Sequence, residues 1–157
     1  ELIKEQGFEL SIQNIKNGLQ NIVKNTGIKG RWQILKKKPL VICDTGHNLD
    51  AMYSIFNQIN SIQYKNLYLI MGFVNDKELE SVFDILPKKA NYIFCQANIP
   101  RAKELSEIAL LADSRNLNFK LIKDVNSAYE YCIEKASTED LIFIGGSTFV
   151  IAELNDL

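Results

Sequence analysis

The sequence predicts an α/β fold in which helices cover both faces of a mostly parallel sheet. From residue 40 onward, short apolar runs alternate with stretches in which apolar residues recur every three or four positions. The run 67–71 is apolar throughout, which is typical of a strand buried on both faces. Regular alternation of this kind requires crossover connections and therefore parallel strands.

The N-terminal part follows a different pattern. Residues 1–8 show no clear periodicity, whereas apolar residues at three- and four-residue steps predict a helix over 11–24, with a stop at Gly27. We expect a strand over 30–35 and a solvated, lysine-rich turn at 36–39. Because parallel neighbours need a crossover of about a dozen residues, this strand can pair with the next one only in the antiparallel sense.

The remaining elements follow in order. We expect strands over 40–43, 67–71, 92–95, 119–122 and 141–144, and helices over 49–59, 79–86, 105–112, 125–136 and after 145–150. Asn75 and Glu78 have the spacing of a capping box before the second of these helices, and Pro87 would stop it. Together the elements predict a Rossmann-like three-layer α/β/α sandwich, with a six-stranded, mostly parallel sheet and one antiparallel edge strand.

Composition is that of a soluble globular domain. The chain has 157 residues, 46% apolar and 24% charged, enough for one α/β domain. The formal net charge of −1 gives no reason to expect nucleic acid or a membrane surface as a partner, and no apolar run approaches the roughly 18 residues of a membrane span. Cys43, Cys95 and Cys132 lack metal-ligand spacing and lie in apolar surroundings, so we expect buried thiols in a reducing cytoplasm.

Polar residues gather where strands end and helices begin. The clusters are 44–48, 72–77, 96–101 and 145–148. If the five strands are parallel, these turns share one rim of the sheet, where ligands collect in open α/β folds. Helix N-termini at that rim present free N–H groups that suit phosphates and carboxylates.

Two residues after the strand 40–43 are ambiguous by themselves. Asp44 could bind ribose hydroxyls or a cation, or could equally serve as a turn or cap residue. His47, the one histidine of the chain, either contacts a ligand or bonds the backbone of its own turn. Asn48 has the position of a helix cap, and Asp50 is an acidic residue of the first helical turn, where a structural role is common.

Two further features allow similar alternatives. Residues 145–147 resemble an anion-binding nest, although glycines at a strand end are also ordinary turn formers. Arg31 suits bidentate recognition of phosphate or carboxylate, but a surface ion pair is the commoner fate of an arginine.

Several catalytic signatures are missing from the sequence. It contains no G-x-x-x-x-G-K-[ST] phosphate loop, and no G-x-G-x-x-G follows the strand 40–43. It has no second histidine, no cysteine pair for a metal and no nucleophile elbow. The predicted rim therefore suits binding of anions but lacks a self-contained catalytic apparatus.

Four ordered motifs, over about residues 11–155, resemble the C-terminal domain of folylpolyglutamate synthase/dihydrofolate synthase in the Mur ligase superfamily. The sequence has Gly30-Arg31-Trp32 followed by Asp44-Thr-Gly-His-Asn48, then Met71-Gly-Phe-Val-Asn-Asp-Lys-Glu78, Pro100-Arg101-Ala102, and Asp140-Leu-Ile-Phe-Ile-Gly-Gly-Ser147. These are similar to the family's G-R-[FLW] with D-G-A-H-N-P, its G-x-x-x-D-K-[DE], its P-R-A and its D-x-[IL]-x-[IV]-x-G-S. Thr45-Gly46 and Leu49 depart from the family pattern.

The resemblance implies an ATP-dependent ligase that uses magnesium. Such enzymes phosphorylate a carboxylate of dihydropteroate or folate, and the amino group of L-glutamate then attacks the acyl phosphate. The resemblance implies that Arg31 reaches the ATP phosphates and Asp44 the ribose. It assigns His47 and Ser147 to glutamate, and gives supporting roles to Asn48, Lys77 and Arg101.

The same resemblance implies a division of labour between domains. Residues 1–28 would be the end of a preceding central ATPase domain or its junction helix, and residues 29–157 the C-terminal domain. The phosphate loop, the magnesium ions and the catalytic residues would lie in the central domain, so the 157 residues alone would be inactive. The alternatives are the C-terminal domain of a peptidoglycan-building Mur ligase and a non-catalytic nucleotide-binding module.

Overall fold

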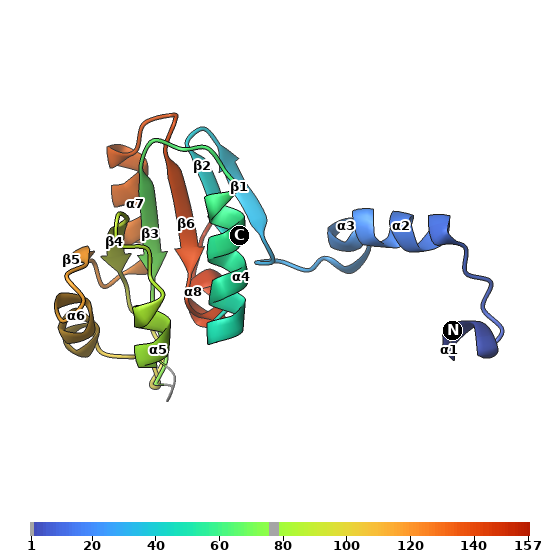
Figure 1. Cartoon of the computed structure of the whole chain (residues 1–157), viewed down its shortest axis with the longest axis horizontal. Helices are drawn as coiled ribbons and strands as arrows, with labels where there is room; N and C mark the ends of the chain where they lie inside the picture. Colours follow the sequence, from blue (N-terminus) through green and yellow to red (C-terminus); the bar gives the residue numbers. More distant parts are fainter. Residues whose placement is uncertain (1, 76–78) are drawn as a thin grey trace.

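The computed structural model, which describes residues 2–75 and 79–157, contains one six-stranded sheet (Figure 1). In spatial order the strands are β1 (Gln33–Lys37), β2 (Leu40–Cys43), β6 (Leu141–Gly145), β3 (Leu67–Met71), β4 (Asn91–Phe94) and β5 (Asn118–Leu121). β1 lies at the edge antiparallel to β2, and every other neighbouring pair is parallel. The predicted fold class is therefore confirmed.

Helices cover both faces of this sheet, as Figure 1 shows. The connections from β2 to β3, β4 and β5 all run in one direction across the sheet, and they contain α4 (Leu49–Asn60), α5 (Leu79–Asp84) and α6 (Leu105–Asp113). The chain then returns from β5 to β6 through α7 (Val125–Lys135) and ends in α8 (Thr148–Ala152). Because parallel crossovers are right-handed, reversing direction places α7 on the opposite face.

The strands separate two apolar cores. Alternate residues point to opposite faces, so Ile42 and Phe143 belong to the core beneath α4 to α6, whereas Val41 and Ile142 belong to the core beneath α7 and α8. Asn48 caps the N-terminus of α4, and its Oδ1 accepts the backbone N–H of Ala51 at 2.8 Å. The expected cap role of Asn48 is thus confirmed, and this cap fixes where the polar turn after β2 ends.

The N-terminal helices extend away from the sheet (Figure 1). They are α1 (Leu2–Glu5), α2 (Ile12–Gln20) and α3 (Ile22–Thr26), and none of them has a buried residue. The single helix expected over 11–24 is broken at Asn21, while Gly27 caps α3 with a φ of 66°, as the sequence predicted. No helix of residues 2–75 and 79–157 has the length and hydropathy needed to cross a membrane.

The strand expected over 30–35 was placed wrongly. β1 begins only at Gln33, because Gly30 and Trp32 have φ values of 65° and 45°, which no strand can include. It also runs on through Lys37, so two of the lysines predicted for a solvated turn lie on the edge strand instead. Exposed lysines on an edge strand discourage pairing with other chains.

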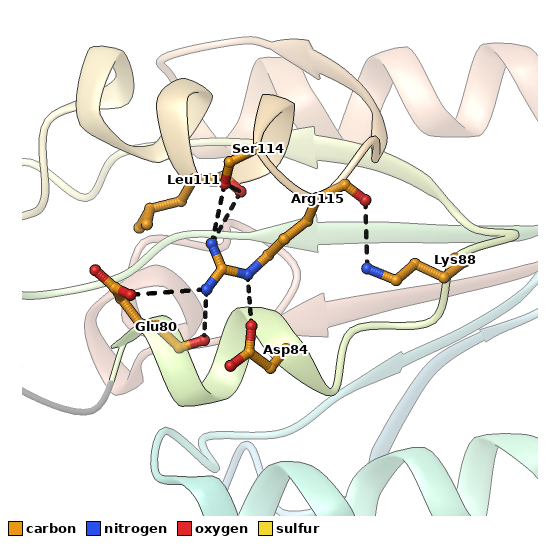
Figure 2. A network of polar contacts seen from close by, with 6 residues as sticks. All are labelled: Glu80, Asp84, Lys88, Leu111, Ser114 and Arg115. Atoms are coloured by element: carbon orange, nitrogen blue, oxygen red, sulfur yellow. Dashed lines mark hydrogen bonds and ion pairs between the residues drawn. The ribbon is translucent and has the colours of Figure 1, made fainter.

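Arg115, after α6, ties that helix to α5 (Figure 2). Its Nε donates to Oδ1 of Asp84 at 2.8 Å, and its Nη1 and Nη2 reach Ser114 Oγ at 3.1 Å and the carbonyl of Glu80 at 3.3 Å. α5 ends at Asp84, two residues before the expected limit of 86. The capping box expected at Asn75 and Glu78 lies partly outside the described residues.

Candidate functional site

The carboxyl ends of β2, β6 and β3 meet at the centre of one rim. The N–H of Asp44 donates to the carbonyl of Ile144 at 3.1 Å, and the N–H of Gly72 donates to that of Gly145 at 3.3 Å. Gly146 has a φ of 89°, and a Cβ there would lie 2.6 Å from the carbonyl oxygen of Gly72. Only glycine fits this position, and it lets the turns after β6 and β3 pack backbone to backbone. The predicted common rim is confirmed.

The Arg31 corner, residues 30–32, is joined to the turn after β2. The N–H of Thr45 donates to the carbonyl of Gly30 at 2.8 Å, and the N–H of Trp32 donates to Oδ2 of Asp44 at 2.7 Å. A Cβ on Gly30 would lie 2.8 Å from Cγ2 of Thr45, so glycine permits this close approach as well as its positive φ. The backbone of Arg31, an exposed residue, is thereby held at the rim close to Asp44.

Asp44 is a half-buried turn residue whose two carboxylate oxygens each accept a backbone N–H. Oδ2 accepts from Trp32 and Oδ1 accepts from Gly46, both at 2.7 Å. The cap of α4 is Asn48, so of the structural roles considered for Asp44 the turn role is the one observed. A carboxylate oxygen has two lone pairs, and a ribose hydroxyl could still donate to either atom.

His47 is exposed and bonds its own turn. Its Nδ1 lies 3.1 Å from the carbonyl oxygen of Thr45. A carbonyl oxygen only accepts, so Nδ1 carries a proton in this contact and Nε2 is left for a ligand. In the neutral ring Nε2 would accept from an ammonium group, and in the protonated ring it would donate to a carboxylate.

Ser147 lies deeper than a simple ligand contact would suggest. It is 3% exposed, and its Oγ accepts the backbone N–H of Phe149 at 3.2 Å as the cap of α8. The hydroxyl proton is not used by that bond, so Ser147 retains one donor. This donor sits directly after the Gly145-Gly146 turn.

Arg101 reaches the rim from the turn after β4. Its guanidinium carbon lies 4.6 Å from the ring centroid of Phe149 in α8, a cation–π contact. The carbonyl of Arg101 accepts the N–H of Asn75 at 3.1 Å, which joins this turn to the one after β3. Arg101 is therefore brought to the same rim as Ser147. Lys77, the other supporting residue expected from sequence, lies outside the described residues.

The cysteines are free and buried, as expected, and they provide no nucleophile. Burial, and to a lesser extent the charge of Asp44, raises the pKa of the Cys43 thiol to about 11. A thiol with such a pKa stays protonated near neutral pH. Within 2–75 and 79–157 no three His, Cys, Asp or Glu side chains are grouped so that they could hold a metal ion.

Two contributors to this site were missed by sequence reasoning. The N–H of Trp32 anchors the Arg31 corner on Asp44, and the ring of Phe149 supports Arg101. Backbone donors carry no sequence signal. The spacing of 48 residues between Arg101 and Phe149 also gave no local pattern to recognise.

Comparison with known proteins adds to this geometry. A model of the family described as "Mur ligase, glutamate ligase domain" matches residues 30–148. The dihydrofolate synthase/folylpolyglutamate synthase of Buchnera aphidicola subsp. Schizaphis graminum is 26% identical over 149 residues, which are 94% of this chain and 34% of that protein. The structure of Escherichia coli FolC in complex with ADP superposes with a TM-score of 0.81 at 22% identity, covering 96% of this chain and 35% of that one.

A more distant relative comes from cell-wall synthesis. The UDP-N-acetylmuramoyl-L-alanyl-D-glutamate–2,6-diaminopimelate ligase of Bacillus cereus is 22% identical over 127 residues, covering 76% of this chain and 26% of that protein. The chain thus spans about a third or less of the length of each of these proteins.

Proposed function

The chain belongs to the Mur ligase, glutamate ligase domain family, and on that premise we propose that it is the C-terminal domain of an ATP-dependent amide ligase. The enzyme adds L-glutamate to dihydropteroate or to tetrahydrofolate, extending polyglutamate tails in the latter case. The observation that carries this proposal is the convergence of Arg31, Asp44 and His47 on one rim, beside the turn that holds Ser147. That rim combines a cation, a carboxylate and free donors at the ends of parallel strands, where ligands bind in open sheets.

Each rim residue has one task in the proposed reaction. The terminal phosphoryl group of ATP passes to a folate carboxylate, and the glutamate nitrogen then attacks the acyl carbon, forming the amide and releasing phosphate. Arg31 binds the phosphates of ATP, and Asp44 accepts hydroxyls of its ribose. His47 and Ser147 hold the glutamate, with Asn48, Lys77 and Arg101 in support. Catalysis then consists of orientation and charge neutralisation in a closed cleft.

Ligands bound to related proteins support this choice of substrates. FolC of Escherichia coli is described in complex with DHPP and ADP, and a bifunctional folylpolyglutamate synthase/dihydrofolate synthase with Mn, AMPPNP and L-glutamate bound. The described residues of this chain offer no cluster of acidic ligands for a divalent ion. We therefore assign the magnesium ion that accompanies ATP to another domain.

We further propose that residues 1–28 form the end of a preceding central ATPase domain or its junction helix, and that residues 29–157 are the ligase C-terminal domain. α2 carries Ile12, Ile15 and Leu19 on one face, and all three are more than half exposed. A helix face of this kind is normally buried against a neighbour. ATP and folates as substrates also favour a cytoplasmic enzyme.

Two other functions remain as alternatives. The Bacillus cereus relative favours a cell-wall ligase that adds an amino acid to a muramyl peptide. A non-catalytic nucleotide-binding module would need only the Arg31–Asp44 half of the rim. The motif Pro100-Arg101-Ala102 and the Gly146-Ser147 pair favour the folate enzyme over the cell-wall ligase.

The choice of acceptor substrate tests the proposal. The full-length gene product containing these residues is incubated with ATP, L-glutamate and either dihydropteroate, tetrahydrofolate or a muramyl precursor, and the products are identified by mass spectrometry. We expect glutamate to be added to a pterin substrate. A muramyl product would replace the proposal with the cell-wall alternative, and no ligation despite tight ATP binding would replace it with the binding module.

A further inference from the structure

Asp44 does more in this structure than face a possible ligand. Its carboxylate bridges two backbone segments, the turn after β2 and the corner that precedes β1, through one bond per oxygen. Both bonds are charge-assisted and 2.7 Å long, which puts them among the strong hydrogen bonds of proteins. The carboxylate is thus part of the framework that shapes the rim.

The Arg31 corner depends on outside support. Trp32 has a φ of 45°, an unfavourable conformation for a residue with a large side chain, and Gly30 before Arg31 has a φ of 65°. Such conformations persist only where the surroundings over-determine them. The support here is local: Gly30 donates its N–H to Oε1 of Gln33 at 2.9 Å and accepts from Thr45, while Trp32 donates to Asp44.

Arg31 is therefore clamped on both sides of its own backbone. On one side Gly30 is bonded to Thr45 and Gln33, and on the other the N–H of Trp32 is bonded to Asp44. The Trp32 ring also packs on Phe143, with centroids 6.4 Å apart. A long, exposed arginine side chain loses less freedom on binding a ligand when its backbone is already fixed.

We propose that Asp44 is a positioning residue for Arg31, a role separable from any contact with ribose. Removing the carboxylate makes the Arg31 corner more mobile, and Arg31 then binds the nucleotide phosphates more weakly. This inference rests on the proposed function for its nucleotide, but its structural half, the locking of the corner, does not.

The test separates the two roles by removing the ribose hydroxyls from the ligand. In the full-length gene product, KM is measured for ATP and for 2′,3′-dideoxy-ATP with Asp44→Ala, Arg31→Ala and the double variant, and with Asp50→Ala as the exposed control. We expect Asp44→Ala to raise the KM for 2′,3′-dideoxy-ATP by about tenfold, the scale of one lost charge-assisted bond. The KM for ATP should rise at least as much, because the contact with the ribose is lost as well. In the Arg31→Ala background, Asp44→Ala should change the KM for 2′,3′-dideoxy-ATP less than twofold.

Two kinetic results would overturn the inference. The first is an unchanged KM for 2′,3′-dideoxy-ATP in Asp44→Ala, which would make Asp44 a ribose contact only. The second is an Asp44→Ala effect that remains undiminished when Arg31 is already absent, because the two residues would then act independently.

Hydrogen exchange followed by mass spectrometry tests the corner directly. Peptides covering 30–33 should exchange faster in Asp44→Ala than in wild type and unchanged in Asp50→Ala, while peptides from β6 should be unaffected. Equal hydrogen-exchange rates at 30–33 in Asp44→Ala and wild type would refute the positioning role. If Asp44→Ala fails to fold, Gln33→Ala loosens the corner from its other side, and it must raise both the exchange and the KM for 2′,3′-dideoxy-ATP. A wild-type product with no ATP-dependent activity would refute the proposed function, and the exchange result would then decide the role of Asp44 by itself.

Discussion

Asp140 offers a quantitative test of how the opposite rim of the sheet is held. Its side chain is 3% exposed and accepts four hydrogen bonds, two on each oxygen. Oδ1 takes the backbone and side-chain N–H groups of Asn66, both at 2.9 Å, and Oδ2 takes the N–H and hydroxyl of Ser137 at 2.7 and 2.9 Å. These bonds fix the start of β6 to the residue that precedes β3.

Asp140→Asn changes this arrangement by one atom. The new NH₂ group must replace one oxygen, and in either orientation a backbone N–H, of Asn66 or of Ser137, loses its acceptor. The Ser137 hydroxyl and the Asn66 amide can reverse their roles, but a backbone N–H cannot. One orphaned donor and the loss of charge from the remaining bonds together cost about 3 kcal/mol of unfolding free energy. For a domain of this size we expect Tm to fall by about 6 to 12 °C.

The acid dependence of stability provides a second readout. Burial acts to raise the pKa of the Asp140 carboxyl, but the bonds from Ser137 and Asn66 outweigh it and hold that pKa below its usual value. A carboxyl with a lower pKa in the folded state adds stability above its unfolded pKa of about 3.9, and this stability is lost as pH falls through the folded value. Asp140→Asn should therefore flatten the acid side of the stability curve.

The assay is urea unfolding followed by circular dichroism between pH 3 and pH 7, for wild type, Asp140→Asn and the exposed control Asp113→Asn. The control should remain close to wild type at every pH. The reasoning would be refuted if Asp140→Asn lowered the unfolding free energy by less than about 1 kcal/mol, or if its unfolding free energy fell with decreasing pH in parallel with wild type. The four hydrogen bonds would then be hardly stronger than the bonds that the same groups make to water in the unfolded state.

Three further predictions concern the rim, the helix pair and the isolated chain. Gly146→Ala should lower the unfolding free energy by about 2–3 kcal/mol in urea titrations, because the φ of Gly146 is 89° and a Cβ there would meet the Gly72 carbonyl. A Cβ on Gly18 would lie in open space, so Gly18→Ala should not destabilise the protein. Equal unfolding free energies for the two variants would contradict the packing described. Arg115→Ala should lower the unfolding free energy by about 1–2 kcal/mol, a modest value because the acidic partners of Arg115 are exposed. Arg115→Lys should restore less than half of that free energy, since one ammonium group cannot reach the same partners. Full restoration by lysine would show that charge alone matters. The 157 residues alone should show no glutamate-dependent ATP hydrolysis in a phosphate-release assay, and activity above the blank would refute the division between domains.

Local periodicity was sufficient to predict the elements of the sheet but not their order. Apolar runs and helical spacing identified all five parallel strands. Four of them, β2, β6, β3 and β4, are buried almost throughout, which constrains nearly every residue, whereas β5 is an edge strand that is mostly exposed. The insertion of β6 between β2 and β3 could not be predicted, since it depends on contacts about 75 to 100 residues apart along the chain. The antiparallel position of β1 was predictable because its short connection excluded the alternative.

The features of the rim that were missed from sequence depend on contacts between distant residues. Gly30 and Trp32 have positive φ values within a stretch whose pattern predicts a strand, and the N–H of Trp32 donates to Asp44, twelve residues away. Asp44 and His47 were chosen as candidates from sequence because polar residues directly after a buried strand are conspicuous. The burial of Ser147 and the stacking of Arg101 on Phe149 are tertiary features that no local pattern encodes.

We propose that this rim binds the nucleotide and the glutamate of a ligase through different residues. It is tested most directly by steady-state kinetics of Arg31→Ala and His47→Ala in the full-length gene product, since both side chains are exposed and neither change should disturb the fold. We predict that Arg31→Ala raises the KM for ATP at least tenfold with little effect on glutamate, and that His47→Ala raises the KM for glutamate with little effect on ATP. If both variants keep wild-type KM values for ATP and for glutamate, the rim does not bind these substrates.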